Sequence, residues 1–487
     1  MLFNSPEFIV FFTIVTILYF VLPHKYRWAM LLAASCVFYM AFIPAYILIL
    51  AVTIVIDYTA GIMIEASCGK KKQKFLIISI ISTCMVLFVF KYFNFFNSFI
   101  AAAAAFFNLK YPVKMLNIIL PIGLSFHTFQ SLSYVIEVYR GHQKAERHFG
   151  IYALYVMFYP QLVAGPIERP QNLLHQFREK HEFDYKRVTD GLKLMVWGMF
   201  KKVVVADRLA ILVNQVYGDP YKYNGIAFII AAVFFAFQIY CDFSGYSDIA
   251  VGAARVMGFR LMKNFDRPYC SKSISEFWRR WHISLSTWFK DYLYISLGGN
   301  RVSKWRWQLN LFITFLVSGL WHGANWTFVI WGALNGFYII FAIWTQEIRN
   351  RISDLTGLSK NKFPVKLWKV FATFCLTCLA WIFFRADNVS EALYIITHAF
   401  SGLDSLFSLS SVNTMLAGLG PNRTDLGFTI IFLTLMEAVN LLQRKYSIAD
   451  ILSNRPTWLR WGIYYFVVLT IIFFGVFGSN SFIYFQF

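Results

Sequence analysis

His322 is the residue whose type and surroundings most directly indicate chemistry. It lies in the motif SGLWHGANW (318–326), inside a stretch (311–344) that contains no Lys, Arg, Asp or Glu. A polar group in hydrocarbon is costly unless it is paired. An ionisable residue at such a position therefore favours a functional role, and a histidine that ties two helices by a hydrogen bond is the alternative.

The composition places this histidine in a membrane protein. Hydrophobic residues make up 58% of the chain and charged residues only 14%, whereas soluble domains carry about 25% charged residues. Several apolar runs are long enough to cross a hydrocarbon core of about 30 Å. The runs are 8–22, 28–43, 45–64, 75–90, 115–138, 226–240, 311–344, 370–384, 428–442 and 462–478. We expect an all-α polytopic protein with about 10–13 crossings, forming a single integral-membrane domain over residues 1–487.

The net charge of +20 follows the positive-inside rule and does not indicate a nucleic-acid partner. Basic residues gather between the apolar runs, at 70–74, 263–310, 349–369 and 444–460. We expect these segments to face the cytoplasm, with 263–310 at the membrane interface. Residues 386–427 contain Arg423 as their one Lys or Arg and are expected outside.

The stretch that carries His322 lies between two basic segments, so the chain must cross an even number of times there. About 34 residues make roughly 50 Å of helix, which is short for two full crossings. We therefore expect a broken, hairpin or re-entrant segment at 311–345, with Gly319, Gly323 and Asn325 near its turn. Irregular backbone at that depth requires a protein-lined cavity, and the glycine spacing favours close helix packing.

A second histidine, His282, lies in the largest basic segment. At helical spacing, residues 275–292 form an amphipathic helix at the cytoplasmic boundary. Its apolar face consists of Trp278, Trp281, Leu285, Trp288, Phe289 and Tyr292, and the next face of Arg279, His282, Ser286 and Lys290. These bases, together with Arg280, predict a wall for a phosphate-bearing substrate. Anchoring to anionic membrane lipid is the alternative.

Taken together, the motifs resemble the membrane-bound O-acyltransferase family. The resemblance is to the bacterial branch of alginate O-acetylation, peptidoglycan O-acetyltransferase and teichoic-acid D-alanylation proteins. It is carried by the two histidine segments, LPIGLSF (120–126), AGPIER (164–169), FSGYSDIA (243–250), LGGNR (297–301) and FIYFQF (482–487). It implies a ring of transmembrane helices around a thinned centre with a cross-membrane tunnel, and it matches His322 to the catalytic histidine and His282 to the second motif histidine. His127 is expected to be a packing residue.

The resemblance also implies the reaction and its place. We expect a multi-pass protein of the inner (cytoplasmic) membrane that moves an acetyl group from acetyl-CoA for O-acetylation of an extracytoplasmic polysaccharide, such as alginate-like exopolysaccharide or peptidoglycan. An imidazole with a pKa near 6.5 suits a general base, and a short-lived acyl-histidine is the other possibility. Trp321 and Asn325 complete the expected substrate-binding set, with Asn325 orienting the imidazole or the carbonyl.

No metal and no bound cofactor are expected, because the acyl thioester is a donor substrate. The seven cysteines are scattered and imply no disulfide framework. The expected partner is a separate extracytoplasmic acyltransferase or a small acceptor protein. D-alanyl transfer from a carrier protein to teichoic acid is the alternative within the family. A transporter or channel, or a non-catalytic scaffold, is the alternative outside it.

Overall fold

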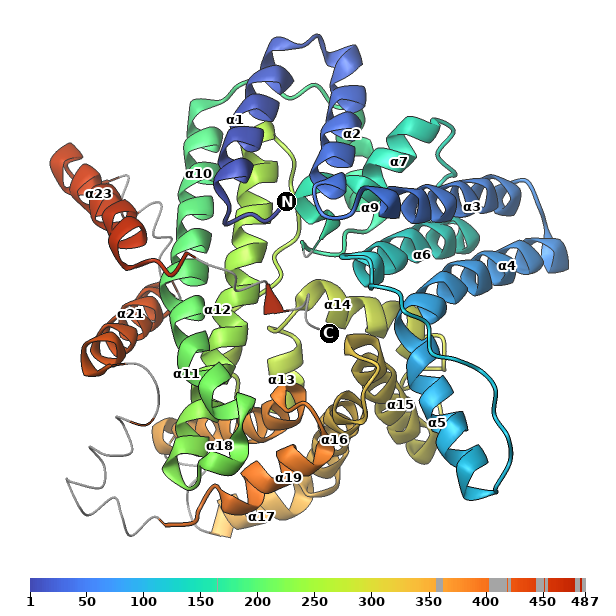
Figure 1. Ribbon diagram of the computed structural model, residues 1–487. Coiled ribbons are helices and arrows are strands. Elements are labelled where there is room, and N and C mark those ends of the chain that lie inside the picture. The colour runs from blue at the N-terminus through green and yellow to red at the C-terminus, as the bar shows by residue number, and fades with distance from the viewer. Residues whose placement is uncertain are drawn as a thin grey trace. The chain divides into compact units, whose positions relative to one another are not determined.

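The computed structural model describes residues 1–163, 165–355, 362–402, 418, 422–443, 451, 454–477 and 482–483. Throughout these residues the regular structure is helical (Figure 1), which confirms the predicted all-α class. Parts of the predicted outside segment 386–427 and of the basic segment 444–460, together with the last four residues, lie outside the described ranges.

Seven described helices are long and apolar enough to cross a membrane, fewer than the 10–13 crossings expected. They are Pro44–Glu65, Gly69–Phe106, Ile226–Met257, Trp326–Trp344, Phe363–Arg385, Arg423–Leu442 and Thr457–Phe474. The difference arises because several apolar runs fall in shorter helices. Residues 8–22, for example, coincide with the 16-residue helix Pro6–Val21, and the run 115–138 is divided between non-helical chain and a 17-residue helix.

The chain divides into two compact units. The first comprises Met1–Met195 and Ser247–Lys263, and the second comprises Val196–Tyr246 and Asn264–Phe487. The helices wholly in the first are α1 (Pro6–Val21), α2 (His24–Met40), η1 (Pro44–Tyr46), α3 (Ile47–Glu65), α4 (Gly69–Leu87), η2 (Phe88–Tyr92), α5 (Phe93–Phe106), α6 (Leu124–Arg140), α7 (Phe149–Met157), α8 (Tyr159–Leu162), α9 (Pro170–Leu173) and η3 (His175–Arg178). The ring and tunnel that the resemblance implies stay predictions.

In the first unit, α3, α4 and α6 pack against one another around buried polar groups (Figure 1). Asp57 of α3 accepts hydrogen bonds from Ser79 at 2.6 Å and Thr83 at 3.0 Å, and a third from Ser131. One turn away, His127 of α6 shares a hydrogen bond with the Thr53 hydroxyl. Because a buried carboxylate without such donors would be costly, these hydroxyls let the three helices pack around it.

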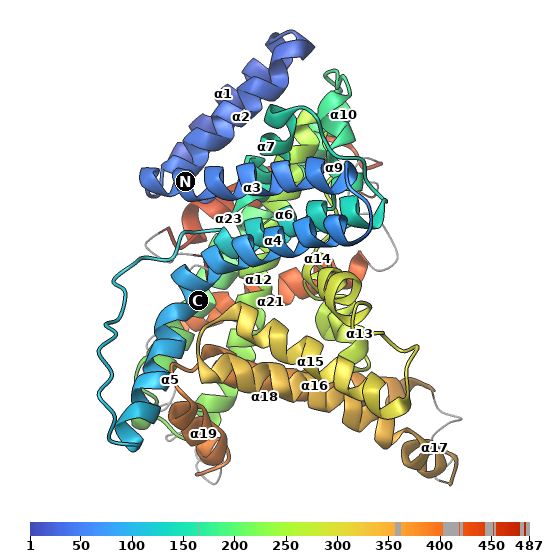
Figure 2. The ribbon, with the colours of Figure 1, turned by 90° about the vertical axis from the view of Figure 1, so that its right-hand side faces the viewer.

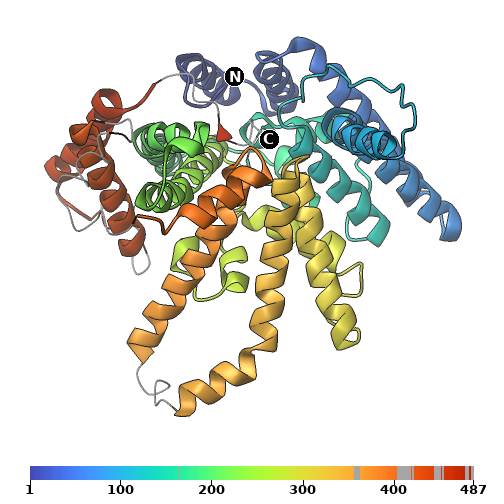
Figure 3. The same cartoon turned by 60° about the horizontal axis from the view of Figure 1, so that its bottom comes forward.

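Two long helices contribute to both units, α10 (Tyr185–Met199) and α12 (Ile226–Met257). The remaining elements of the second unit are η4 (Phe200–Ala206), α11 (Asp207–Gly218), η5 (Pro220–Lys222), η6 (Pro268–Cys270), α13 (Ile274–Trp278), α14 (Ile283–Trp288), η7 (Phe289–Tyr294), α15 (Lys304–His322), α16 (Trp326–Trp344), α17 (Gln346–Leu355), α18 (Lys362–Arg385), α19 (Val389–His398), α21 (Arg423–Leu442) and α23 (Thr457–Phe474). In this unit α15 packs along α16, and α18 packs against α16 (Figure 2). The short α17 follows at the far end of α16 (Figure 3).

The hairpin of α15 and α16 carries His322 at its turn. Gly323 is extended at φ −164° and ends α15. Asn325 begins α16, because its side chain accepts a hydrogen bond from the Thr327 amide at 3.1 Å. Each arm has 19 residues, or about 28 Å of helix. The hairpin is longer than its apolar run, since α15 already starts at Lys304.

Glycines allow the two arms to approach closely. A side chain at Gly319 would place its Cβ 2.3 Å from the carbonyl oxygen of Phe328 and 3.1 Å from the Cα of Gly332. Neither atom belongs to a flexible side chain, so only glycine fits where α15 crosses α16. The small-residue spacing therefore serves helix packing, as in other membrane bundles.

Candidate active site

The imidazole of His322 lies in a pocket of aromatic rings. His322 is only 4% exposed. Its ring centroid lies 4.8 Å from that of Trp321, 4.9 Å from Trp331 and 5.2 Å from Phe384. These rings come from α15, α16 and α18, and each meets the imidazole edge to face. Three helices of the second unit therefore hold the imidazole in an apolar wall that keeps water away.

His282 lies close to the same wall. Its ring centroid is 6.3 Å from that of Trp321, the residue next to His322. The ring of Phe243 of α12 lies at 4.6 Å, and that of Phe265 at 6.5 Å. Trp381 then lies 5.1 Å from Trp281 and 5.8 Å from Trp331, so one aromatic cluster joins the surroundings of the two histidines.

The backbone of His282 adopts an unusual conformation. Its φ of 41° and ψ of 57° place it in the left-handed region, where few residues other than glycine occur. Asn264 satisfies the backbone beyond it, because its carbonyl accepts from the Ile283 amide at 2.9 Å and its side chain from the Ser284 amide at 3.2 Å. Strain held by tertiary contacts is frequent at functional sites.

This conformation contradicts the prediction of one amphipathic helix over residues 275–292. The segment instead consists of α13, a turn at Arg279–His282, α14 and η7. The helix breaks because Asn264, 20 residues before Ser284 in the chain, supplies the acceptors that a preceding helical turn would have supplied. His282 consequently leaves the predicted polar face and is fully buried. Burial lowers its pKa to about 3, so the imidazole is neutral at physiological pH.

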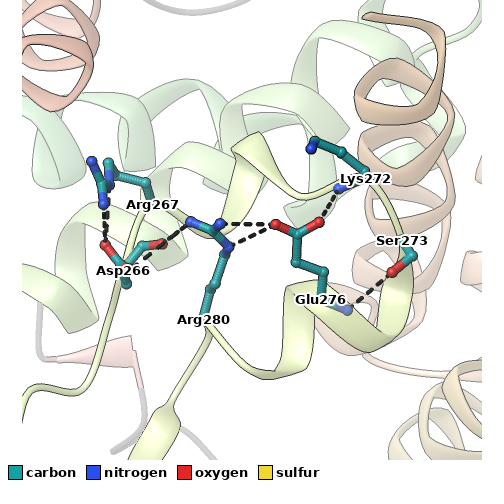
Figure 4. A network of polar contacts seen from close by, with 6 residues as sticks. All are labelled: Asp266, Arg267, Lys272, Ser273, Glu276 and Arg280. Atoms are coloured by element: carbon teal, nitrogen blue, oxygen red, sulfur yellow. Dashed lines mark hydrogen bonds and ion pairs between the residues drawn. The ribbon is translucent and has the colours of Figure 1, made fainter. Parts of the chain in front are cut away.

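The basic residues near His282 differ in their surroundings. Arg279 and Lys290 are exposed. Arg280, in contrast, is held by two carboxylates (Figure 4): its guanidinium lies 2.8 Å from Glu276 and 3.9 Å from Asp266. Its charge is therefore balanced within the protein.

Glu276 also organises the start of α13 (Figure 4). Its second carboxylate oxygen accepts from the Lys272 amide at 2.9 Å, while Ser273 caps the helix by accepting from the Glu276 amide at 3.1 Å. This reciprocal arrangement is a variant of the capping box. The ion pair with Arg280 thus extends a helix cap into the turn that leads to His282.

Two predicted binding residues have local structural tasks. Asn325 caps α16, and its amide nitrogen donates to the carbonyl of Asp387 at 2.8 Å. The prediction that it orients the imidazole is not matched by these contacts. The Ser286 hydroxyl donates to the carbonyl of Trp281 at 3.1 Å, across the turn that contains His282.

Comparison with known proteins decides the family. The model of the membrane-bound O-acyltransferase family matches residues 147–384, which include both histidines. The probable alginate O-acetylase of Pseudomonas aeruginosa is 39% identical over 436 residues, covering 88% of this chain and 81% of that protein. The chain belongs to the membrane-bound O-acyltransferase family. The predicted resemblance is confirmed.

Other relatives of this O-acyltransferase differ in the acyl group that their names specify, acetyl or D-alanyl. The peptidoglycan O-acetyltransferase of Helicobacter pylori is 35% identical, covering 81% of this chain and 79% of that protein. The teichoic acid D-alanyltransferase of Streptococcus thermophilus is 27% identical, with coverages of 54% and 68%. The chain is therefore an enzyme, an O-acyltransferase, and a multi-pass membrane protein. This excludes the non-catalytic scaffold and the transporter as its primary role.

Several residues that shape the O-acyltransferase site were not predicted from the sequence. The rings of Trp331 and Phe384 pack against His322, and Asn264 fixes the backbone beside His282. The first two lie in apolar runs rich in aromatic residues, which indicate burial but not position. A lone asparagine in a basic segment carries no signal, because its role depends on a contact made only in the folded chain.

A buried ion cluster also escaped prediction. Lys202 of η4 lies 2.9 Å from Asp207 and 2.8 Å from Asp242, and all three are under 6% exposed. Asp242 immediately precedes Phe243, the ring that packs on His282. Since breaking one partner of a buried pair leaves an uncompensated charge, this cluster fixes α12 against η4 and holds Phe243 in place.

Proposed function

We propose that this enzyme transfers an acetyl group from acetyl-CoA for the O-acetylation of a polysaccharide outside the cytoplasm. The observation that carries the proposal is the position of His322, an imidazole enclosed by Trp321, Trp331 and Phe384 at the turn of the α15–α16 hairpin. The relatives named for acetylation are 35–40% identical over most of the chain, which favours acetyl over D-alanyl.

His322 acts as the general base in this proposal. It takes the proton from the acceptor hydroxyl while that oxygen attacks the thioester carbonyl carbon. The tetrahedral intermediate then expels the thiolate, which receives the same proton from the imidazolium. The surrounding rings exclude water and so protect the thioester from hydrolysis. His282, neutral and buried beside Trp321, is proposed to support this step as a positioning residue.

The donor's phosphates are proposed to meet Arg279 and Lys290. Both side chains are exposed, in the basic segment expected at the cytoplasmic face. Arg280 contributes less than the sequence suggests, because Glu276 and Asp266 already hold its guanidinium. Donor binding through exposed charges weakens as salt rises, since ions screen such contacts.

We place the enzyme in the inner (cytoplasmic) membrane, acting with a separate extracytoplasmic acyltransferase or a small acceptor protein. Acyl thioesters are made inside the cell, whereas the polysaccharides lie outside, so the acyl group must cross. Alginate-like exopolysaccharide and peptidoglycan are the proposed acceptors, after the names of the relatives. Vesicles with acetyl-CoA on one side and the partner on the other test this relay, which is refuted if transfer needs both on the same side.

Replacement of His322 tests the chemistry. His322→Ala and His322→Gln are expected to lower acetyl transfer from labelled acetyl-CoA by about 10²-fold or more, the range of a general base. His127→Gln is the matched control, because His127 is equally buried but lies in the first unit, and it should retain transfer within about threefold. Near-wild-type transfer by a folded His322→Ala enzyme would refute the proposal.

A further inference from the structure

The AGPIER motif organises a part of the first unit that contains neither histidine of the site. Glu168 of this motif is fully buried. Its carboxylate accepts from the Met262 amide at 2.5 Å and from the Asn172 side chain at 2.5 Å. It thereby ties the chain after α12 to the chain around α9.

The same junction is closed by a second clamp. Gln176 is 5% exposed, and its side chain accepts from the Arg260 amide at 2.8 Å and donates to the Arg260 carbonyl at 3.0 Å. Gly258 lies beside His181 at φ +107°, where a Cβ would come within 2.7 Å of the His181 Cβ. Only glycine allows this approach, so the backbone of residues 258–262 is held in one conformation.

A cleft of about 790 Å³ lies beside this junction, between residues 172–190 and 251–261. Its basic side chains include Lys186, Arg255 and Arg260, and all three are exposed. Across the described ranges, none of the three side chains makes an ion pair or a hydrogen bond to the protein. The clamps fix the backbone of Arg260 but leave its guanidinium available.

The acidic side chains of the cleft have partners of their own. Glu179 lies 3.6 Å from His175, and Asp190 lies 3.1 Å from Lys193. Asp184 accepts from the Arg187 amide at 2.6 Å, at the start of α10. Four Lys and Arg side chains line the cleft against three carboxylates, so its formal charge is positive.

We propose that this cleft binds a phosphate-bearing ligand, with Arg255 and Arg260 as the paired contacts to the phosphate oxygens and Lys186 as a third cation. Guanidinium groups bind phosphate through two parallel hydrogen bonds. Clefts of about 300–1,000 Å³ hold ligands of nucleotide or headgroup size. The phosphate belongs either to the nucleotide end of a thioester donor or to the headgroup of an anionic phospholipid. The proposal does not depend on the acetyl-transfer chemistry, because it concerns binding.

The test measures binding to the purified full-length enzyme in a neutral detergent. One probe is adenosine 3′,5′-bisphosphate, for the nucleotide source. The other is dihexanoyl phosphatidylglycerol, for the headgroup. The variant Arg255→Gln/Arg260→Gln removes both guanidinium charges at exposed positions. It is expected to weaken the binding of one of the two probes by about tenfold or more. Arg255→Lys/Arg260→Lys keeps the charge and should lose less of the affinity for that probe.

Arg351→Gln is the matched control, because Arg351 is another exposed arginine in the described chain and does not line the cleft. It should bind both probes within about twofold of the wild type. Weaker binding of the nucleotide in the double variant assigns the cleft to the donor, in place of Arg279 and Lys290, and weaker binding of the lipid assigns it to the membrane. If the wild type binds neither probe, or the double variant binds both as the wild type does, the proposal is overturned.

Discussion

His282 combines a buried imidazole with a left-handed backbone, and the two properties can be separated by substitution. Asparagine tolerates φ near +41° better than other side chains do, whereas a β-branched residue is strained there. We expect His282→Val to be less stable than His282→Asn by about 1–2 kcal/mol. Thermal unfolding followed by size-exclusion chromatography in detergent measures the difference.

The control is the same pair of substitutions at His127, which lies within α6. Asparagine and valine have similar helix propensities, so His127→Asn should show no such advantage over His127→Val. An equal advantage at both positions would mean that the backbone of His282 is not the cause.

The titration of His282 predicts a pH effect on stability. Its folded pKa of about 3 lies below the unfolded value of 6.5, because burial disfavours the charged ring. The unfolded chain therefore binds the proton first, and stability present above pH 6.5 is lost as the pH falls toward 3. As the pH falls from 7 to 5, the free energy of unfolding of His282→Asn should rise by about 2 kcal/mol relative to that of the wild type.

Unfolding midpoints of both proteins across this range test the effect. A constant difference between wild type and His282→Asn would contradict a neutral, buried His282. The pH dependence of acyl transfer offers a second measurement. If His282 is neutral throughout, any change in transfer rate near neutral pH must come from the titration of another group.

At the scale of elements, the hairpin of α15 and α16 depends on two glycines that face one another, Gly319 of α15 and Gly332 of α16. Gly319→Ala would push a Cβ to 2.3 Å from the Phe328 carbonyl oxygen, which cannot move without shifting α16. We expect the variant to lose about 1–3 kcal/mol of folding stability, which is the usual cost of overpacking a core. Acyl transfer should fall as well, because His322 lies less than one turn away.

Gly462→Ala in α23 is the matched control, since a Cβ there meets nothing within 4 Å. It should be neutral or stabilising by up to about 1 kcal/mol, as alanine favours helix over glycine. Both variants are compared by the fraction that remains monodisperse after heating. Equal behaviour of the two would refute the role of Gly319 in helix packing.

For the whole molecule, the distribution of charge predicts sidedness. Ser303 precedes α15 in the basic segment, and Ser390 lies in α19 after the span that ends at Arg385. Both are exposed. In a background without native cysteines, Ser303→Cys should react with an impermeant thiol reagent only from the cytoplasmic side, and Ser390→Cys only from outside.

Restoring Cys68 alone provides the reference for the cytoplasmic side, because it is exposed and adjoins the basic residues 70–74. Labelling of Ser303→Cys and Ser390→Cys from one side would refute the assignment. It would also remove the argument that the chain crosses an even number of times at the hairpin.

The sequence by itself determined the membrane class and the family, and it singled out His322 as the candidate catalytic residue. Hydropathy is a sum over neighbouring residues, and the motif SGLWHGANW is local, so both can be recognised without a fold. The break near Gly323 follows for the same reason, because glycine and a helix-capping asparagine act within a few residues.

Only the tertiary structure decided the geometry around the two histidines. Helical periodicity placed His282 on a polar face beside Arg279, but Asn264 captures the amides of Ile283 and Ser284 and starts a new helix there. Likewise Arg280 looked free for phosphate until Glu276 and Asp266 were found beside it. Periodicity reports the local preference of a segment, whereas contacts between distant residues, which replace its hydrogen bonds and neutralise its charges, exist only once the chain has folded.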